Sequence, residues 1–599
     1  MTYKNSLLVF TTIIILLSFV YTVNTTKEDR FLSDLQILVF QAEKLNKAAD
    51  AYKFNTYSLE SLRKDIAETR LQYKEIEFLI DYYYPSFTEE HLNGAPLLHV
   101  EHANDFPLVM FPEGLQVLDE SIYEDDIDKS QIAILAKKLE SSCVQLLKGN
   151  KGKQVTNKEL IEAMKFQISR ISTLGITGFD TPGSSNVIEE ALASIKGMSV
   201  YFDSYFGVMK GAEQTKELFL ESQNYLANKE LNFENFNRLE FIREFLNPLY
   251  SSLNGYYVSS QHVTSSVNQL ANTPYDADFL DPYFFTLLTK KEDSEQLRKL
   301  GKKLFNDSQL SENGVMNCGS CHASDKAFTD GIKKSESNIK DQTVTRNSPT
   351  LLNSVYSDRY FYDLRAFNLE QQVEHVIFNS KEFNTAYESI LEKLNKDKDY
   401  KKEFKEVFKT KNVSRIEFSK ALSSYVLSLQ SFDSEFDKYM RKEINTIDER
   451  IIEGFNLFMG KAACGTCHFP PTYAGLAPPY YNKNESEILG VLETPMSFNK
   501  KIDADSGRIN NGLPGENVWI YEKSFKTSTV RNVEFSAPFF HNGAYPTLES
   551  VLDFYNHGGG AGIGLNVKNQ TLSSDSLLLD DSEKRNIILF LNSLSDTNS

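Results

Sequence analysis

The sequence predicts an all-α protein whose two halves differ in texture. Residues 28–272 carry apolar side chains at helical spacing, for example Leu38, Ala42 and Leu45, without convincing β alternation. Beyond residue 290 the helical stretches shorten, the loops lengthen, and the pattern Cys-x-x-Cys-His occurs twice. Long loops indicate that something other than a large hydrophobic core organises that part. We therefore expect an N-terminal helical bundle followed by a region of different architecture.

Composition narrows the possible function classes. The chain has 599 residues, of which 41% are hydrophobic and 24% charged, as in ordinary globular domains and unlike disordered or polytopic membrane proteins. Acidic residues outnumber basic ones by 82 to 64, giving a net charge of −18 that repels phosphate. Nucleic acid is therefore not an expected partner. Five cysteines are too few for a disulfide scaffold of this length.

The N-terminal segment, residues 1–27, predicts export to the periplasm. Lys4 precedes an apolar stretch over residues 6–23, which is long for a signal peptide and just long enough for one membrane span. No clear small-x-small cleavage site follows it. The segment is thus either a cleaved signal peptide or a retained membrane anchor, and the sequence leaves both open.

Individual helices can be placed within residues 28–272. A run from Ile66 to Ile80 keeps helical spacing, Ser58 is its expected N-cap, and Pro85 ends it. Further helices are expected at 157–174 and 188–209. The next segment, NTPYDADFLDP from residue 272 to 282, is rich in proline and aspartate, and we predict an interdomain linker over residues 273–289.

The two Cys-x-x-Cys-His patterns predict covalent attachment of two c-type haems. They are Cys318-Gly319-Ser320-Cys321-His322 and Cys464-Gly465-Thr466-Cys467-His468. Thiols at this spacing form thioethers with the two vinyl groups of one haem, and the adjacent histidine becomes the proximal iron ligand. A zinc site does not need a histidine after each second cysteine, and a thioredoxin-type pair needs a βαβ context, which is missing. Cys143 is left over as a small buried hydrophobe.

Residues 290–595 resemble the bacterial di-haem cytochrome c peroxidases and their relative MauG. The resemblance rests on LGKKLFNDSQLS (300–311), CGSCHASDKAFTDG (318–331), RNSPTLLN (346–353), FYDLRAFNLEQQ (361–372), FNLFMGKAACGTCH (455–468) and FKTSTVRNVEFSAPFFHNGAYPTLESVLDFYNHGG (525–559). It implies two cytochrome c-like helical domains, a first, peroxidatic one at residues 290–445 and a second, electron-transferring one at 446–599. Residues 28–272 lie outside this family pattern, and their role is not indicated.

The resemblance also implies residue roles at the first haem. Glu382 and Gln372 match the distal polar pair, in which the glutamate moves a proton between the peroxide oxygens and the glutamine orients the peroxide. The other reading of Glu382 is a solvated surface residue. His375, one helical turn beyond Gln372, is a further candidate for this site. The loop at 332–345, where relatives carry a distal histidine, contains neither His nor Met, which excludes a sixth ligand from that loop.

Two tyrosines depart from the peroxidase pattern. Tyr362 replaces the usual tryptophan between the haems, as an electron relay or a packed aromatic, and the single tryptophan, Trp519, lies elsewhere. Tyr555 stands fourteen residues after His541, where peroxidases have a methionine ligand and MauG has tyrosine. A phenolate ligand would give the second haem a low potential. The rival ligand is Met496, and His541 is expected near the haems without binding iron.

Calcium is the remaining ligand that the resemblance implies. Asn347 and the backbone carbonyls of Ser536 and Pro538 match the family's calcium ligands, and oxygen donors suit this ion. The alternative is that they are ordinary turn residues beside prolines.

The leading hypothesis is an enzyme that reduces hydrogen peroxide at the first haem with electrons from a small redox protein such as a cytochrome c. A second hypothesis is a MauG-like enzyme that oxidises side chains of a protein substrate, which Tyr555 favours. A third is a non-enzymatic di-haem electron-transfer or sensor protein. Glu382 and a first haem without a sixth ligand from the loop at 332–345 argue for peroxide chemistry over the third.

Overall fold

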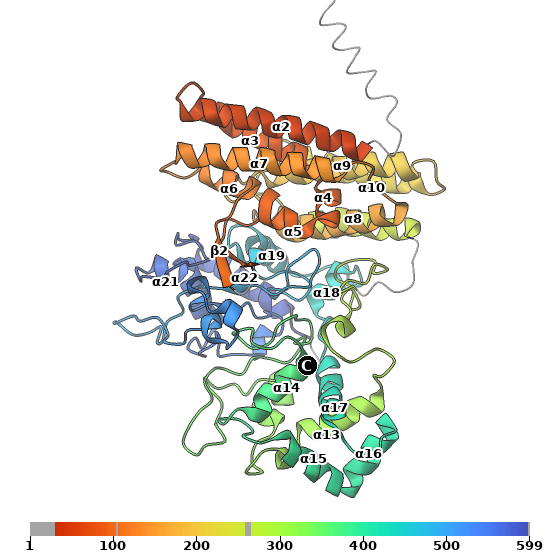
Figure 1. Ribbon diagram of the computed structural model, residues 1–599, viewed down its shortest axis with the longest axis vertical. Helices are drawn as coiled ribbons and strands as arrows, with labels where there is room; N and C mark the ends of the chain where they lie inside the picture. The colour runs from red at the N-terminus through yellow and green to blue at the C-terminus, as the bar shows by residue number, and fades with distance from the viewer. Residues whose placement is uncertain (1–29, 104–105, 258–264, 597–599) are drawn as a thin grey trace, which may run out of the picture.

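The computed structural model describes residues 30–103, 106–257 and 265–596, and its helical content confirms the predicted fold class. Figure 1 shows an N-terminal helical domain at one end, the region of the first attachment motif at the other, and the region of the second motif between them. The predicted leader at residues 1–27 lies outside the described residues. Within the described ranges, no helix has both the length and the hydrophobicity needed to cross a bilayer.

The N-terminal domain is a helical bundle with α2 at its outer edge (Figure 1). Its α-helices are α2 (Arg30–Lys53), α3 (Leu59–Lys74), α4 (Glu77–Tyr83), α5 (Pro85–Phe87), α6 (Leu115–Ser121), α7 (Lys129–Gly149), α8 (Asn157–Arg170), α9 (Val187–Phe206), α10 (Ala212–Leu226), α11 (Arg238–Glu240) and α12 (Asn247–Ser252). Helix α2 packs on α3 and α7, where Cys143 is buried as predicted. Ser58 caps α3 by accepting a 3.1 Å hydrogen bond from the Ser61 amide, also as predicted.

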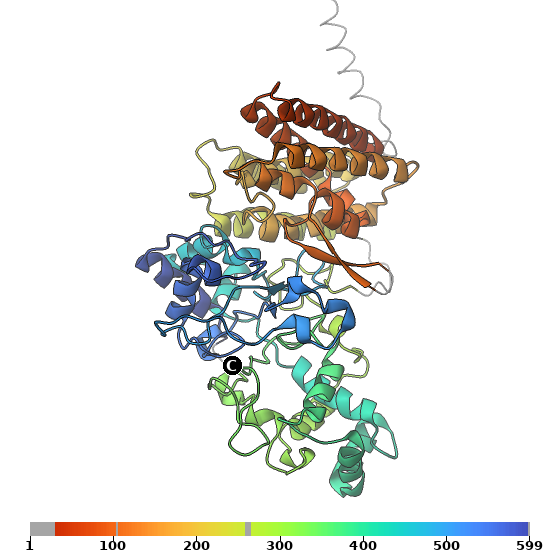
Figure 2. The same cartoon turned by 60° about the vertical axis from the view of Figure 1, so that its left-hand side comes forward.

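Two short antiparallel strand pairs, the first of them a hairpin, interrupt the helical fold where the sequence predicted no strand. They are β1 (His99–Ala103) with β2 (Phe106–Met110), and β3 (Ser486–Glu487) with β4 (Phe525–Lys526). Strands of five and two residues are too short for a clear alternation. Hairpin β1–β2 projects toward the second haem domain, and β2 contacts the turn Pro514–Glu516 (Figure 2).

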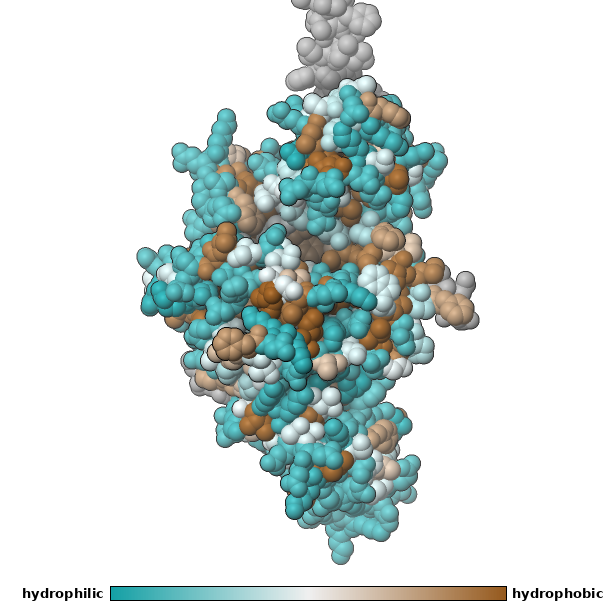
Figure 3. Space-filling model, turned by 90° about the vertical axis from the view of Figure 1, so that its left-hand side faces the viewer, coloured by the Kyte–Doolittle hydropathy of each residue, from teal (hydrophilic) through white to brown (hydrophobic). Residues whose placement is uncertain are grey.

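Phe106 is 76% exposed on this hairpin. Figure 3 shows that apolar side chains gather at mid-height on one face of the molecule.

A buried ionic cluster ties the helices of the N-terminal domain together. The Asp180 carboxylate accepts hydrogen bonds from Lys74 at 2.5 Å, Arg170 at 2.7 Å and Gln116 at 2.8 Å. All four side chains are buried. Removing one of these charged groups would leave the others buried without a partner and without water, which strongly destabilises a folded domain.

The two haem domains repeat one helix arrangement. The first contains α13 (Glu295–Phe305), α14 (Leu369–Phe378), α15 (Tyr387–Lys396), α16 (Lys398–Phe408), α17 (Arg415–Leu427) and α18 (Glu435–Met440), and the second contains α19 (Glu449–Met459), α20 (Leu548–Asn556), α21 (Gly559–Gly562) and α22 (Asp581–Ser593). Helix α13 crosses α17, and α19 crosses α22. A glycine permits each crossing, since a Cβ on Gly301 would meet the Ala421 carbonyl at 1.9 Å and one on Gly454 would meet the Asn586 carbonyl at 2.0 Å.

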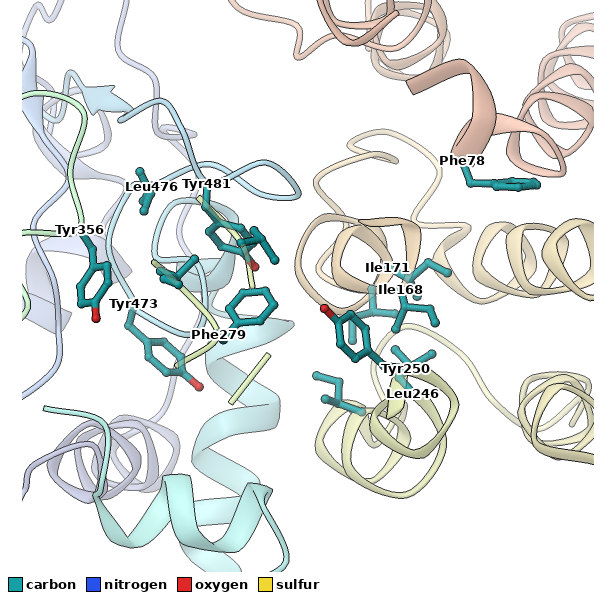
Figure 4. Packing of buried hydrophobic residues seen from close by; sticks show 14 of the residues in the cluster. Phe78, Ile168, Ile171, Leu246, Tyr250, Phe279, Tyr356, Tyr473, Leu476 and Tyr481 are labelled. Carbon is teal, nitrogen blue, oxygen red and sulfur yellow. The ribbon is translucent and has the colours of Figure 1, made fainter. Parts of the chain in front are cut away.

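The predicted linker contains the helical turn Pro282–Phe285 and is packed rather than free. Tyr275 and Phe279 are buried, and the Phe279 ring lies 5.5 Å from the ring of Tyr481 in the second haem domain. Figure 4 shows Phe279 and Tyr481 on one side of this boundary and Tyr250 of α12 on the other. The segment therefore joins the two domains through apolar contacts, and the domain limits given above stay predictions.

Candidate functional site

A cavity of about 820 Å³ lies in the first haem domain, and we call it the first-haem cavity. It is lined by the residues that the first motif and the family pattern had singled out: Cys318, Cys321, His322, Gln372, His375, Glu382, Tyr362 and Asn347. These residues come from segments up to 64 positions apart, between 318 and 382, yet they line one cavity. The volume falls in the range of cavities that hold cofactors.

The attachment motifs fit a covalently bound haem at both positions. His322 Nδ1 donates to the Phe328 carbonyl at 3.0 Å, and His468 Nδ1 donates to the Tyr473 carbonyl at 3.2 Å. A carbonyl can only accept, so each Nδ1 carries the proton and each Nε2 keeps its lone pair for iron. The four cysteines of the motifs form no disulfide and keep their thiols for thioether bonds. The same arrangement thus occurs in both haem domains.

Glu382 lines the first-haem cavity, which disfavours its reading as a solvated surface residue. Asn379 Nδ2 donates a 2.7 Å hydrogen bond to Glu382 Oε1. Burial raises the pKa of Glu382 to about 7, against the opposing effects of Arg365 and of this hydrogen bond. A carboxyl group that titrates near neutrality can both accept and return a proton.

The loop at 332–345 is fastened to the backbone beside Glu382. The Ser337 hydroxyl donates to the Lys381 carbonyl at 2.8 Å, and the Asn338 amide donates to the same oxygen at 3.0 Å. The loop therefore fixes the backbone of Lys381, the residue that precedes Glu382. His375 lines the same cavity, with its ring 5.7 Å from that of Phe361.

Tyr362 connects the first-haem cavity with the second haem domain. Its side chain is half-buried and contacts the Ser528 hydroxyl, and the backbone of Ser528 contacts the His468 ring. One residue thus separates Tyr362 from the second proximal histidine. Trp519 is half exposed in a turn of the second domain and does not line the cavity.

At the second motif the structure brings Tyr555 next to the attachment cysteines. Burial, with the neighbouring Cys467 and Cys464, raises the pKa of Tyr555. Met496, the rival ligand, is 90% exposed on the surface. His541 is buried, and its Nε2 lies 3.3 Å from Asp503 Oδ1, so this nitrogen is engaged by a carboxylate.

Asn347, one of the predicted calcium ligands, is fixed by two hydrogen bonds to backbone carbonyls. Asn347 Nδ2 donates to the Ile332 carbonyl at 3.0 Å, and its backbone amide donates to the His541 carbonyl at 2.8 Å. Both donors of Asn347 are therefore occupied, and its side-chain oxygen is the atom left for a cation. Ser536 and Pro538 follow as part of a turn with a cis Ala537–Pro538 bond.

Sequence reasoning missed several residues of this site. Arg365 and Lys526 bring positive charge to the cavity wall, and burial lowers the pKa of Lys526 to about 8. Asn379 holds Glu382, and Ser528 connects Tyr362 with His468. The sequence held one signal for three of these residues. The stretches that carry the family resemblance include Arg365, Lys526 and Ser528, so the resemblance could have identified them as candidate site residues.

Comparison with known proteins finds relatives over about half of the chain. The profile of the family described as di-haem cytochrome c peroxidase matches residues 295–445. The cytochrome c551 peroxidase of Nitrosomonas europaea is 30% identical over 44% of this chain and 73% of its own length, and that of Pseudomonas aeruginosa is 30% identical over 50% and 79%. The methylamine utilization protein MauG of Methylophilus methylotrophus is 25% identical over 49% and 81%.

Among solved structures, a MauG-like protein associated with microbial copper homeostasis is similar, with 24% identity, a TM-score of 0.44, and coverage of 52% of this chain and 92% of that one. The matches to the curated peroxidases span most of their length and about half of this chain. Family membership implies two c-type haems, which the paired motifs fit. The chain therefore belongs to the di-haem cytochrome c peroxidase family.

Proposed function

We propose that the protein is a periplasmic peroxidase that reduces hydrogen peroxide in the first-haem cavity with electrons from a small redox protein. The observation that carries this proposal is the cavity itself, which collects a half-buried carboxyl group, an amide side chain and a proximal histidine whose Nδ1 is held by a backbone carbonyl. When bound, the first haem supplies the iron at which peroxide is reduced. Reduction consumes two electrons and two protons and releases two waters.

The protein's own residues would handle the protons and the orientation of peroxide. Gln372 would hold peroxide through its amide, and Glu382 would take the proton from one peroxide oxygen and return it to the leaving oxygen. Asn379 keeps the Glu382 carboxylate in place through its 2.7 Å hydrogen bond. Tyr362, between the cavity and Ser528, is the proposed relay for electrons from the second haem domain.

A second candidate function is MauG-like oxidation of side chains in a protein substrate. Tyr555 favours it, since this tyrosine lies beside Cys464 and Cys467 where a phenolate would stabilise oxidised iron. The exposed position of Met496 argues against the methionine alternative. His322 would be the protein ligand of the first haem, and His468 with Tyr555 those of the second. A calcium ion on Asn347, Ser536 and Pro538 is part of the same proposal.

Steady-state assays with reduced cytochrome c and peroxide separate the two candidates. We expect catalytic oxidation of the cytochrome with two equivalents consumed per peroxide. Failure to oxidise any small redox donor, combined with a spectral response of the haems to peroxide, would favour the protein-substrate reading. No spectral response to peroxide would contradict both.

A further inference from the structure

The N-terminal domain covers the second attachment motif. The turn Ile171–Gly175 contacts the turn Cys464–Thr466, and a Cβ on Gly465 would lie 3.3 Å from the Thr177 side chain. Helix α11 packs on α19, with the Leu239 amide donating to Asn456 Oδ1 at 3.0 Å. A redox partner is therefore kept from approaching this side of the motif directly. An electron that arrives from this side crosses the N-terminal domain.

Tyrosines occupy the boundary between the two domains. Tyr481, buried in the second haem domain, donates to the Pro470 carbonyl at 3.0 Å, two residues beyond His468. Its neighbour Tyr480 reaches into the N-terminal domain, where its hydroxyl donates to the Asp81 carbonyl at 2.7 Å and its ring lies 4.9 Å from Phe166. Tyrosine side chains thus lead from the second motif into the other domain.

The next tyrosine along this line has a proton acceptor. The Tyr82 phenol is close enough to Tyr480 to raise its pKa, and the Tyr82 ring lies 6.3 Å from that of Phe166. Tyr82 donates to Glu162 Oε2 at 2.6 Å, and Tyr257 donates to Oε1 of the same carboxylate at 3.1 Å. Both phenols are half-buried, so they lie within reach of an external partner. A phenol that is hydrogen-bonded to a carboxylate can lose an electron readily, because its proton moves to the carboxylate along the existing hydrogen bond.

We propose that Tyr82 and Tyr257, with Glu162, form a redox-active site through which an external one-electron donor supplies the second haem domain by way of Tyr480. This inference rests on the proposed peroxidase function, whose peroxide is the terminal oxidant. Tyr82 loses one electron, which passes through the hydrogen bond between the Asp81 carbonyl and the Tyr480 hydroxyl without oxidising Tyr480, and the phenolic proton of Tyr82 passes to Glu162. The donor, a small redox protein, then returns one electron, and Glu162 returns the proton. Two such cycles, with two protons from solvent, convert one peroxide to two waters.

The test traps tyrosyl radicals in the protein with both haems bound. Peroxide is added without a reductant in the presence of a nitroso spin trap, and peptide mass mapping locates the adducts while absorbance follows the haems. We expect adducts on Tyr82 or Tyr257 in the wild type, and their loss in Tyr480→Phe and in Glu162→Gln. The matched control is Tyr57→Phe, since Tyr57 also donates to a carboxylate, Asp65 at 2.7 Å, but lies outside this line of rings.

The outcomes separate the two levels of the proposal. Retention of wild-type adduct yield at Tyr82 in Tyr480→Phe would overturn the route. A normal haem response to peroxide with no adduct at Tyr82 or Tyr257 would overturn the site and leave the peroxidase function standing. If the haem absorbance does not respond to peroxide in the wild type, the proposed function fails and this inference fails with it.

Discussion

Asn379 and Glu382 are joined by a 2.7 Å hydrogen bond from Asn379 Nδ2 to Glu382 Oε1 at the wall of the first-haem cavity. The two residues are three positions apart, on the turn that follows α14. The bond favours the charged carboxylate, whereas burial disfavours it, and burial prevails. The resulting pKa of about 7 gives the reaction with peroxide a pH dependence that can be measured.

The rate of reaction with peroxide should rise with pH through a midpoint of about 7, because only the ionised Glu382 can accept the peroxide proton. Rapid-mixing absorbance measured across this range gives the midpoint. Asn379→Ala should move the midpoint to higher pH, since it removes a bond that stabilises the carboxylate. Asn384→Ala is the matched control, because Asn384 is exposed on the same turn and its amide bonds to Glu312. A rate that is independent of pH would exclude Glu382 as the base.

Much of this site could be predicted from local sequence, and the remainder depends on long-range packing. The attachment motifs and the Ser58 cap are encoded by residues a few positions apart, so the sequence contains them directly. The contact of Tyr362 with Ser528 joins positions 166 apart, and the packing of Thr177 on Gly465 joins positions in different domains. Neither follows from periodicity. Strands β1 to β4 were missed because they are too short for an alternating pattern.

Tyr362→Phe should slow electron transfer between the haems while leaving the first reaction with peroxide intact. The substitution keeps the ring but removes the hydroxyl that contacts Ser528. Rapid-mixing absorbance at wavelengths that distinguish the two haems reports both steps. Trp519→Phe is the control, since Trp519 is half exposed away from the cavity. Equal rates of electron transfer between the haems in wild type and Tyr362→Phe would show that Tyr362 is a packed aromatic and not a relay.

Tyr555→Met should raise the reduction potential of the second haem strongly, because a thioether stabilises reduced iron and a phenolate stabilises oxidised iron. Tyr555→Phe should also raise it, since the charged donor is lost. A redox titration of each variant measures the change. Met496→Leu should leave the potential unchanged, as Met496 is 90% exposed. If Met496→Leu changed the potential and the Tyr555 substitutions did not, Met496 rather than Tyr555 would be the ligand of the second haem.

Asp180→Ala should destabilise the N-terminal domain by about 3–5 kcal/mol, because it leaves Lys74 and Arg170 buried without their shared partner. Denaturant unfolding followed by circular dichroism measures the loss. Asp203→Ala removes a pair with Lys216 at the surface, where Asp203 is 65% exposed, and should cost at most about 1 kcal/mol. Equal effects of the two substitutions would show that the buried cluster does not stabilise the bundle.

The role of Glu382 in peroxide reduction is tested most directly by the rate of the haem absorbance change after rapid mixing of Glu382→Gln with peroxide. This variant should retain both covalent haems and react about 10²–10⁴-fold more slowly than the wild type, the usual contribution of a positioned acid–base group. Glu388→Gln, at an exposed position of α15, is the control and should react at the wild-type rate. An unchanged rate in Glu382→Gln would contradict the assignment of Glu382 as the group that moves the peroxide proton.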